Sequence, residues 1–195
     1  MRTDRYANGQ MADKPYEPIL LTDKSRLQEI YDLRIAAWEN SERICSINKT
    51  KFPNGWVEEI DKDAFHFVVF DDSNKIVASA RISLHNSLDE LPYPSAFRSF
   101  NLPTDRPFAF YSRLVVSPNH RNSLLLKKLD QIRIAFLKEN KIPFAIATCK
   151  DKRLKSVIEI GFEVLGRTTV QYAEKDEESA LILMLDNIKI NENEQ

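Results

Sequence analysis

The sequence has few cysteines, almost no net charge and no long apolar run, and each absence excludes a class of protein. Cys45 and Cys149 are its two cysteines, and neither lies in a metal-binding spacing, so we expect reduced thiols, a cytoplasmic protein and no metal site. A net charge of −1 gives no electrostatic reason to bind nucleic acid or an anionic membrane. No stretch approaches the roughly 20 apolar residues of a membrane span, and the polar N-terminus lacks the apolar core of a signal peptide.

Length and hydrophobic content predict a single buried domain. A chain of 195 residues with 43% hydrophobic content is long enough to enclose one core, and it contains no repeats or low-complexity segments. Residues 1–15 and 188–195 are polar and lack periodicity, so we expect two tails around a domain at 16–187.

Apolar spacing and turn signals predict three helices. Apolar residues recur every three or four positions over 27–38 and 122–140, and Thr22 or Asp23 can cap the first of these helices. A shorter helix is expected over 151–160, because Gly161 is a typical helix stop. Residues 56–64 predict a single helical turn.

Runs of β-branched and aromatic residues between these helices predict the strands of a mixed sheet. We expect strands at 17–21, 65–70, 75–85, 108–117, 142–149, 162–173 and 180–188. The intervening residues 86–107 contain four of the nine prolines and predict a long loop with one helical turn near 95–100. The predicted fold class is therefore α/β, a mixed twisted sheet with helices on both faces.

Residues 108–126, FAFYSRLVVSPNHRNSLLL, predict a strand that leads through a short basic turn into a helix. Pro118 ends the strand, and Asn119, Asn122 and Ser123 can each cap the helix that follows. A helix that begins directly after a strand presents free backbone N–H groups, which favour a bound anion.

This order resembles the GNAT superfamily of N-acyltransferases, in which a strand ending in V-x-P precedes Arg/Gln-x-x-Gly-x-Gly/Ala. Arg121 holds the first position of that motif, whereas Leu124 and Leu126 hold the glycine positions. The segment IEIGFEVLG and the hairpin VVFDDSNKIVASARI also resemble parts of the superfamily, so the likeness covers residues 18–187. It implies a single GNAT-like domain that acts as an acyltransferase.

The resemblance also implies a donor, acetyl-CoA or a longer acyl-CoA, with an acyl carrier protein as a possible alternative. The strand backbone at Leu114, Val115 and Val116 would hold the pantetheine arm. The start of the helix would hold the phosphates, through Arg121, Asn122, Ser123, Leu124 and Leu126. The two leucines keep their N–H donors, so they are expected to narrow the phosphate site and not to delete it.

A narrower likeness, to acyl-homoserine-lactone synthases and N-acyl amino acid synthases, comes from the order of five charged residues. It implies that Glu58 and four substrate-binding residues line the acceptor side: Arg34, Asp61, Arg81 and Arg113. The alternative is that these residues form partly buried ion pairs that only fix the fold. In either case period-two counting along the strands predicts that Arg81 and Arg113 face Glu58 or Asp61, because an unpaired buried charge costs several kcal/mol.

The resemblance places a catalytic base at the position of Phe110 and an acid at that of Val157, and neither residue can transfer a proton. His66, Tyr111 and Cys149 could substitute for them, and Glu58 or Asp61 could act as a base through a water molecule. His66 is expected to titrate near neutrality and Tyr111 to protonate the leaving thiolate. Each also has a purely structural interpretation, as a hydrogen-bonded histidine, a core aromatic or a buried thiol. His85 and His120 are interpreted as loop or rim residues.

Two function hypotheses follow. The first is an N-acyltransferase that moves an acyl group from acyl-CoA, or from an acyl carrier protein, to the amine of a small, amino-acid-like acceptor. The second is a non-catalytic GNAT-fold protein that binds a ligand or a partner, which the missing base and acid favour. A homodimer remains possible under either hypothesis.

Overall fold

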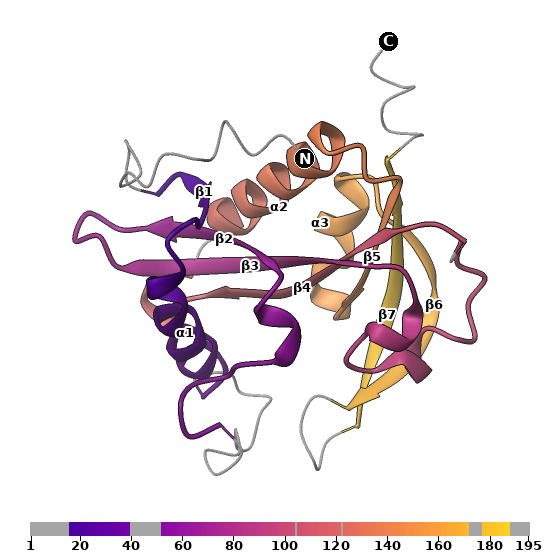
Figure 1. Cartoon of the computed structure of the whole chain (residues 1–195), viewed down its shortest axis with the longest axis horizontal. Helices are drawn as coiled ribbons and strands as arrows, with labels where there is room; N and C mark the ends of the chain where they lie inside the picture. The colour runs from indigo at the N-terminus through magenta and orange to yellow at the C-terminus, as the bar shows by residue number, and fades with distance from the viewer. Residues whose placement is uncertain (1–15, 40–51, 104, 122, 172–176, 188–195) are drawn as a thin grey trace. The chain divides into compact units, whose positions relative to one another are not determined.

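The computed structural model describes residues 16–39, 52–103, 105–121, 123–171 and 177–187, and the predicted tails lie outside these ranges. Seven strands form one sheet in the order β1-β2-β3-β4-β5-β7-β6 (Figure 1). They are β1 (Pro18–Leu20), β2 (Phe65–Phe70), β3 (Ile76–His85), β4 (Phe108–Val116), β5 (Phe144–Cys149), β6 (Glu163–Gln171) and β7 (Glu177–Asp186). The α-helices are α1 (Leu27–Glu39), α2 (Ser123–Glu139) and α3 (Leu154–Glu159). Because β4 and β5 are parallel whereas β1 and β2 are antiparallel, the predicted mixed α/β sheet is confirmed.

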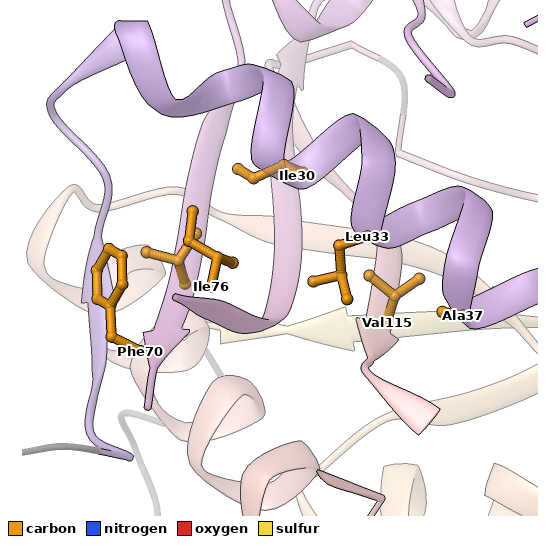
Figure 2. Close-up of a cluster of buried hydrophobic side chains, with 7 residues drawn as sticks. Ile30, Leu33, Ala37, Phe70, Ile76 and Val115 are labelled. Carbon is orange, nitrogen blue, oxygen red and sulfur yellow. The ribbon is translucent and has the colours of Figure 1, made fainter. Parts of the chain in front are cut away.

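By its internal contacts the chain divides into two compact units, residues 1–81 with 113–133 and residues 82–112 with 134–195. In the first unit, α1 packs on β2, β3 and the end of β4 through one apolar cluster, which Figure 2 shows. Its members are Ile30, Leu33, Ala37, Val68, Phe70, Ile76 and Val115. Burying a large apolar side chain stabilises a fold by about 1.5–3 kcal/mol, so this cluster holds α1 firmly on the sheet.

The start of α1 follows the sequence prediction. The Asp23 side chain accepts a hydrogen bond from the Ser25 backbone N–H at 3.0 Å, in a short 3-10 turn, Lys24–Arg26, that leads into the helix. Of the two predicted caps, Asp23 is therefore the one that binds a helical N–H group.

In the second unit, β7 pairs with both β5 and β6 in antiparallel register. β7 begins at Glu177, three residues before the predicted start, because its first residue pairs with Gln171 at the end of β6. Gly166 lies at a register shift in β6, and a Cβ atom there would meet the Phe100 ring at 2.6 Å. The glycine thus lets the 86–107 segment pack against β6.

The segment 86–107 anchors several apolar side chains in the core, while many of its other described residues are exposed. Its 3-10 turns are Leu88–Glu90 and Pro94–Ala96, so the helical turn predicted near 95–100 lies slightly earlier. Leu91, Phe97 and Leu102 are buried, and the Phe97 ring meets Phe110 edge-on at 5.8 Å. These contacts make the long loop part of the core.

Among the helices that the structure describes, none combines the length and the apolarity needed to cross a membrane. Within the same described ranges no group of three or more histidine, cysteine, aspartate or glutamate side chains is placed to hold a metal ion.

Candidate active site

The candidate site begins at the turn that follows Gly55. Gly55 has a φ of +84°, and a Cβ atom there would lie 2.7 Å from Cβ of Tyr31 on α1. Only glycine tolerates both conditions, so the chain can pass directly over α1. The next residue, Trp56, donates its backbone N–H to the Tyr31 carbonyl at 3.1 Å. This contact fixes the 3-10 turn Glu59–Asp61 above the helix.

Five charged side chains converge beside this turn, and we call them the charged cluster: Arg34, Glu58, Asp61, Arg81 and Arg113. Arg34 holds Asp61 with two hydrogen bonds of 2.7 and 2.9 Å, and Arg81 Nη1 lies 2.7 Å from the same carboxylate. Arg81 Nη2 also lies 2.9 Å from Glu58. Arg113 binds Glu58 through Nε at 2.7 Å and through Nη2. The predicted convergence of Arg81 and Arg113 on Glu58 or Asp61 is therefore present in the structure.

The cluster is graded in depth. The side chains of Arg34, Asp61 and Arg81 are at most 1% exposed, whereas Arg113 is 7% and Glu58 is 18% exposed. The Arg113 guanidinium also lies over the Trp56 ring, 4.5 Å from its centroid, in a cation–π contact. The inner three residues form a closed network, and the outer pair is the part that another molecule can reach.

Both carboxylates of the cluster are held ionised. Burial would raise the pKa of Glu58, but Arg113, Arg81 and Arg34 outweigh it and leave the pKa below its usual value. Burial would also raise the pKa of Asp61, but hydrogen bonds and charges from Arg34 and Arg81 outweigh it and bring this pKa well below the usual range. A carboxylate held in this way is a weak proton acceptor. Glu58 therefore fits ion pairing better than the catalytic base role predicted for it.

His66 was expected to titrate near neutrality, and the structure corrects this. Burial lowers the pKa of His66 to about 4, with a smaller opposing effect from its hydrogen bond to the Asp61 backbone. Nε2 lies 3.2 Å from the Asp61 carbonyl oxygen, so it carries the proton and donates it. His66 is a neutral side chain that braces the turn of the charged cluster.

Strand β4 is irregular where it carries Arg113. Arg113 has a φ of +52°, a left-handed conformation that is unusual for a side chain of this size and costs about 1–2 kcal/mol. Among described residues the ladder between β4 and β5 consists of Ala109–Ala145, Phe110–Ile146 and Tyr111–Ala147. β4 continues to Val116 beyond this ladder, and Ser112 to Leu114 are only half-buried. Strand β4 therefore combines a strained backbone at Arg113 with partial exposure of Ser112 to Leu114.

Solved structures with the same arrangement, a strand that pairs in parallel with its neighbour and leads into a helix, were compared with this chain. An N-acyl amino acid synthase from uncultured soil microbes, FeeM, aligns with a TM-score of 0.63 over 88% of this chain and 91% of its own, at 13% identity. The CoA-dependent acyl-homoserine lactone synthase BjaI aligns with a TM-score of 0.65 over 88% and 82% of the two chains, at 15% identity. The chain has the GNAT fold.

An N-acetyltransferase from Staphylococcus aureus Mu50 shares the same fold, with a TM-score of 0.60, 12% identity and coverage of 88% of this chain and 97% of that one. No protein-family model matches the sequence, and no curated protein matches it. At these identities the similarity concerns the GNAT fold itself, and the chemistry has to be argued from the residues of this chain.

In this GNAT-fold protein the residues predicted to hold the donor follow β4 into α2. Leu114 is half-buried, and Val115 and Val116 are buried at the end of β4. Leu124, in the first turn of α2, is 56% exposed, so its side chain points away from the core. Leu126, two residues further along α2, is half-buried.

Three further residues predicted to bind the phosphates of the acyl donor, Arg121, Asn122 and Ser123, come at the start of α2 in the sequence. Arg121 donates from Nη2 to the Ala37 carbonyl oxygen near the end of α1, at 3.1 Å. Ser123 is the first residue of α2, and Asn122 lies outside the described residues. The contact of Arg121 with α1 does not exclude a phosphate, since a guanidinium has five N–H donors.

The other predicted catalytic side chains are less well suited to proton transfer. Tyr111 is 4% exposed and meets the Phe162 ring edge-on at 5.6 Å, as a core aromatic would. Burial raises the pKa of the half-buried Cys149 thiol, which disfavours the thiolate that a nucleophile needs. Phe110 and Val157, at the expected base and acid positions, are both buried.

The sequence analysis did not predict the buried contacts of two residues, Trp56 and His85. Trp56 binds Arg34 through its carbonyl oxygen at 3.0 Å and supports Arg113 with its ring. His85, interpreted as a rim residue, is buried at the end of β3 with a serine beside it. The i, i+2 spacing of Ser83 and His85 on one strand face was a signal that could have indicated this pair.

Proposed function

We propose that this GNAT-fold protein is an N-acyltransferase that moves an acyl group from acyl-CoA to the amine of a small, amino-acid-like acceptor. The observation that carries the proposal is the charged cluster, in which three arginines meet two carboxylates. Arginine is the side chain best suited to bind a carboxylate, because its planar fork forms two parallel hydrogen bonds.

The graded burial of the cluster supports an acceptor site at its outer pair, Arg113 and Glu58. Arg34, Asp61 and Arg81 are closed off and serve as a fixed base for the outer pair. Arg113 and Glu58 are partly accessible, so the carboxylate of an acceptor can share or replace Glu58 on the Arg113 guanidinium. The strained backbone of Arg113 supports this assignment, since such conformations cluster at functional sites.

The donor fits beside the same strand. The proposal places the pantetheine arm, and the oxyanion that forms during acyl transfer, along the β4 backbone near the half-buried Leu114. The Leu124 side chain is 56% exposed, which supports placing the phosphates at the first N–H groups of α2. When bound, acyl-CoA supplies the activated thioester, and the chain positions it next to the acceptor amine.

Free thiol release from acetyl-CoA and from longer acyl-CoAs tests this function. Turnover is expected with amino acids and is expected to fall sharply with matched amines that lack the carboxylate. An equal rate with both kinds of acceptor would contradict carboxylate recognition by the charged cluster.

A non-catalytic ligand-binding role is the second candidate, and a specific observation favours it. The expected base and acid positions, Phe110 and Val157, are buried apolar residues. This role predicts an intact fold that binds amino acids or acyl-CoA by calorimetry and releases no thiol. Thiol release above background with any acceptor of the panel would exclude it.

A further inference from the structure

Glu58 and Arg113 form the accessible end of the charged cluster, and Glu58 is shared between two arginines. Glu58 Oε2 lies 2.7 Å from Arg113 Nε and 2.9 Å from Arg81 Nη2, and Oε1 meets Arg113 Nη2. All three residues belong to the first compact unit. Glu58 therefore keeps a cationic partner, Arg81, when Arg113 turns to another carboxylate.

Asp61, the other carboxylate of the cluster, is enclosed by its partners. It accepts hydrogen bonds from Arg34 at 2.7 and 2.9 Å, from Arg81 at 2.7 Å and from the Glu58 backbone N–H at 2.8 Å. Its side chain is 1% exposed, against 18% for Glu58. Of the two carboxylates, Glu58 is therefore the one that can exchange its partner for a ligand.

The charges of the Glu58–Arg113 pair limit which ligand can open it. Both side chains are mostly buried, and a mostly buried charge that loses its compensation is strongly destabilising. A ligand with only a carboxylate replaces Glu58 on Arg113 and offers Glu58 nothing in return, and a ligand with only an ammonium does the reverse. A zwitterion compensates both side chains and adds no net charge to the site.

We propose that the acceptor enters the charged cluster as a zwitterion and exchanges partners with the Glu58–Arg113 ion pair, an inference that rests on the proposed function. The acceptor carboxylate binds the Arg113 guanidinium through two hydrogen bonds, and the acceptor ammonium pairs with Glu58, which stays in contact with Arg81. An α-amino acid carries these two groups on one carbon, so both can reach two side chains that touch each other. One ion pair is thus replaced by two.

The same exchange drives release of the product. Acyl transfer converts the acceptor ammonium and the thioester into an amide and a free thiol, with one proton released to solvent. The amide nitrogen carries no charge, so the product no longer compensates Glu58. Glu58 then returns to Arg113 and displaces the product carboxylate, which makes Glu58 an internal competitor of the product.

Tryptophan fluorescence of the full chain measures this exchange without acyl transfer. The chain has two tryptophans, Trp38 and Trp56, whose rings meet edge-on at 5.1 Å, and the Arg113 guanidinium lies 4.5 Å from the Trp56 ring centroid. A ligand that moves Arg113 is expected to change the emission. The standard amino acids are titrated with and without CoA, and calorimetry covers ligands that leave the emission unchanged. Each amino acid that binds is compared with its N-acetyl derivative and with the amine that lacks its carboxylate.

The wild-type protein should bind an amino acid about 10- to 100-fold more tightly than either derivative, the value of a lost charge-assisted hydrogen bond. Glu58→Gln should abolish the preference over the N-acetyl derivative, because an amide side chain attracts an ammonium weakly and competes weakly for Arg113. Glu59→Gln is the matched control, since Glu59 is the next residue of the chain, is 83% exposed and pairs with Lys62 at 2.6 Å. This variant should keep the preference.

The outcomes separate this inference from the proposed function. An N-acetyl derivative that binds as tightly as its amino acid overturns the zwitterion exchange and leaves carboxylate recognition by Arg113 standing. Amino acids that bind with the expected preference but release no thiol from acyl-CoA overturn acyl transfer and keep the exchange as a binding device. If no amino acid binds, the exchange is overturned whatever the thiol assay shows. If Glu58→Gln fails to fold, the three wild-type affinities decide.

Discussion

Residues of the charged cluster differ in depth, and depth decides what their substitution does. Arg81 is fully buried between Asp61 and Glu58, so Arg81→Met leaves the buried Asp61 carboxylate and the partly buried Glu58 carboxylate with less compensation. We expect a loss of about 3–5 kcal/mol in the free energy of unfolding, measured by urea denaturation. Arg26→Met is the control, because Arg26 pairs with Glu29 nearer the surface. This substitution should lower the free energy of unfolding much less.

Arg113 should behave differently, because it is partly exposed and Glu58 keeps its ion pair with Arg81 when Arg113 is removed. Arg113→Met is expected to keep the fold and the affinity for acyl-CoA while raising acceptor KM about 10- to 100-fold, the value of one or two charge-assisted hydrogen bonds. Kinetics at saturating donor measure this. A variant that unfolds would instead support the interpretation of the cluster as purely structural ion pairs.

His66 makes stability depend on pH in a defined window. Its pKa is about 4 in the folded chain against an ordinary value of 6.5, so the unfolded state binds the proton more readily. The contribution of His66 to the free energy of unfolding is fully present above pH 6.5. It decreases by about 3 kcal/mol as the pH falls towards 4, because each pKa unit corresponds to about 1.4 kcal/mol.

Denaturation curves at several pH values test the His66 prediction. The slope of stability between pH 6.5 and 4 should be smaller in His66→Gln than in the wild type, with His120→Gln as the comparison. An unchanged slope in His66→Gln would show that other groups produce the dependence.

At the scale of elements, the turn over α1 depends on Gly55. An alanine there adds a Cβ atom 2.7 Å from Tyr31 Cβ in a left-handed backbone conformation, so Gly55→Ala should cost at least about 2 kcal/mol. It should also raise acceptor KM, because the turn carries Glu58 and Asp61. Thermal unfolding and acceptor kinetics measure the two effects. The exposed neighbour Asn54→Ala should change neither.

At the scale of the whole molecule, donor binding should stabilise the fold. At 100 times its dissociation constant, acyl-CoA should add about 2.7 kcal/mol, which for a chain of this size raises Tm by roughly 5 to 10 °C. Leu124→Asp places a negative charge at the start of α2 and should remove most of this shift. Ile158→Asp is the control, because Ile158 is a similarly exposed apolar residue on α3. This variant should keep the Tm shift. Equal shifts in both variants would place the phosphates elsewhere.

Much of the fold was determined by the sequence alone, because it depends on local periodicity. The strand at 65–70 was predicted with its observed bounds, and the helix at 122–140 differs from α2 by one residue at each end. Period-two counting also predicted that Arg81 and Arg113 face the carboxylates at 58 and 61, since a buried charge requires a partner.

Only the tertiary structure decided the properties that depend on neighbours distant in sequence. The low pKa of His66 results from burial, which no local pattern reports. Arg121 reaches a carbonyl 84 positions earlier, and the left-handed backbone conformation of Arg113 lies in a strand whose sequence pattern is regular. His85 was interpreted as a rim residue because its chain position is a strand end, yet Phe108 and Phe110 cover it. Periodicity reveals which face a side chain occupies, and the packing of distant segments decides how deeply it lies and what it can do there.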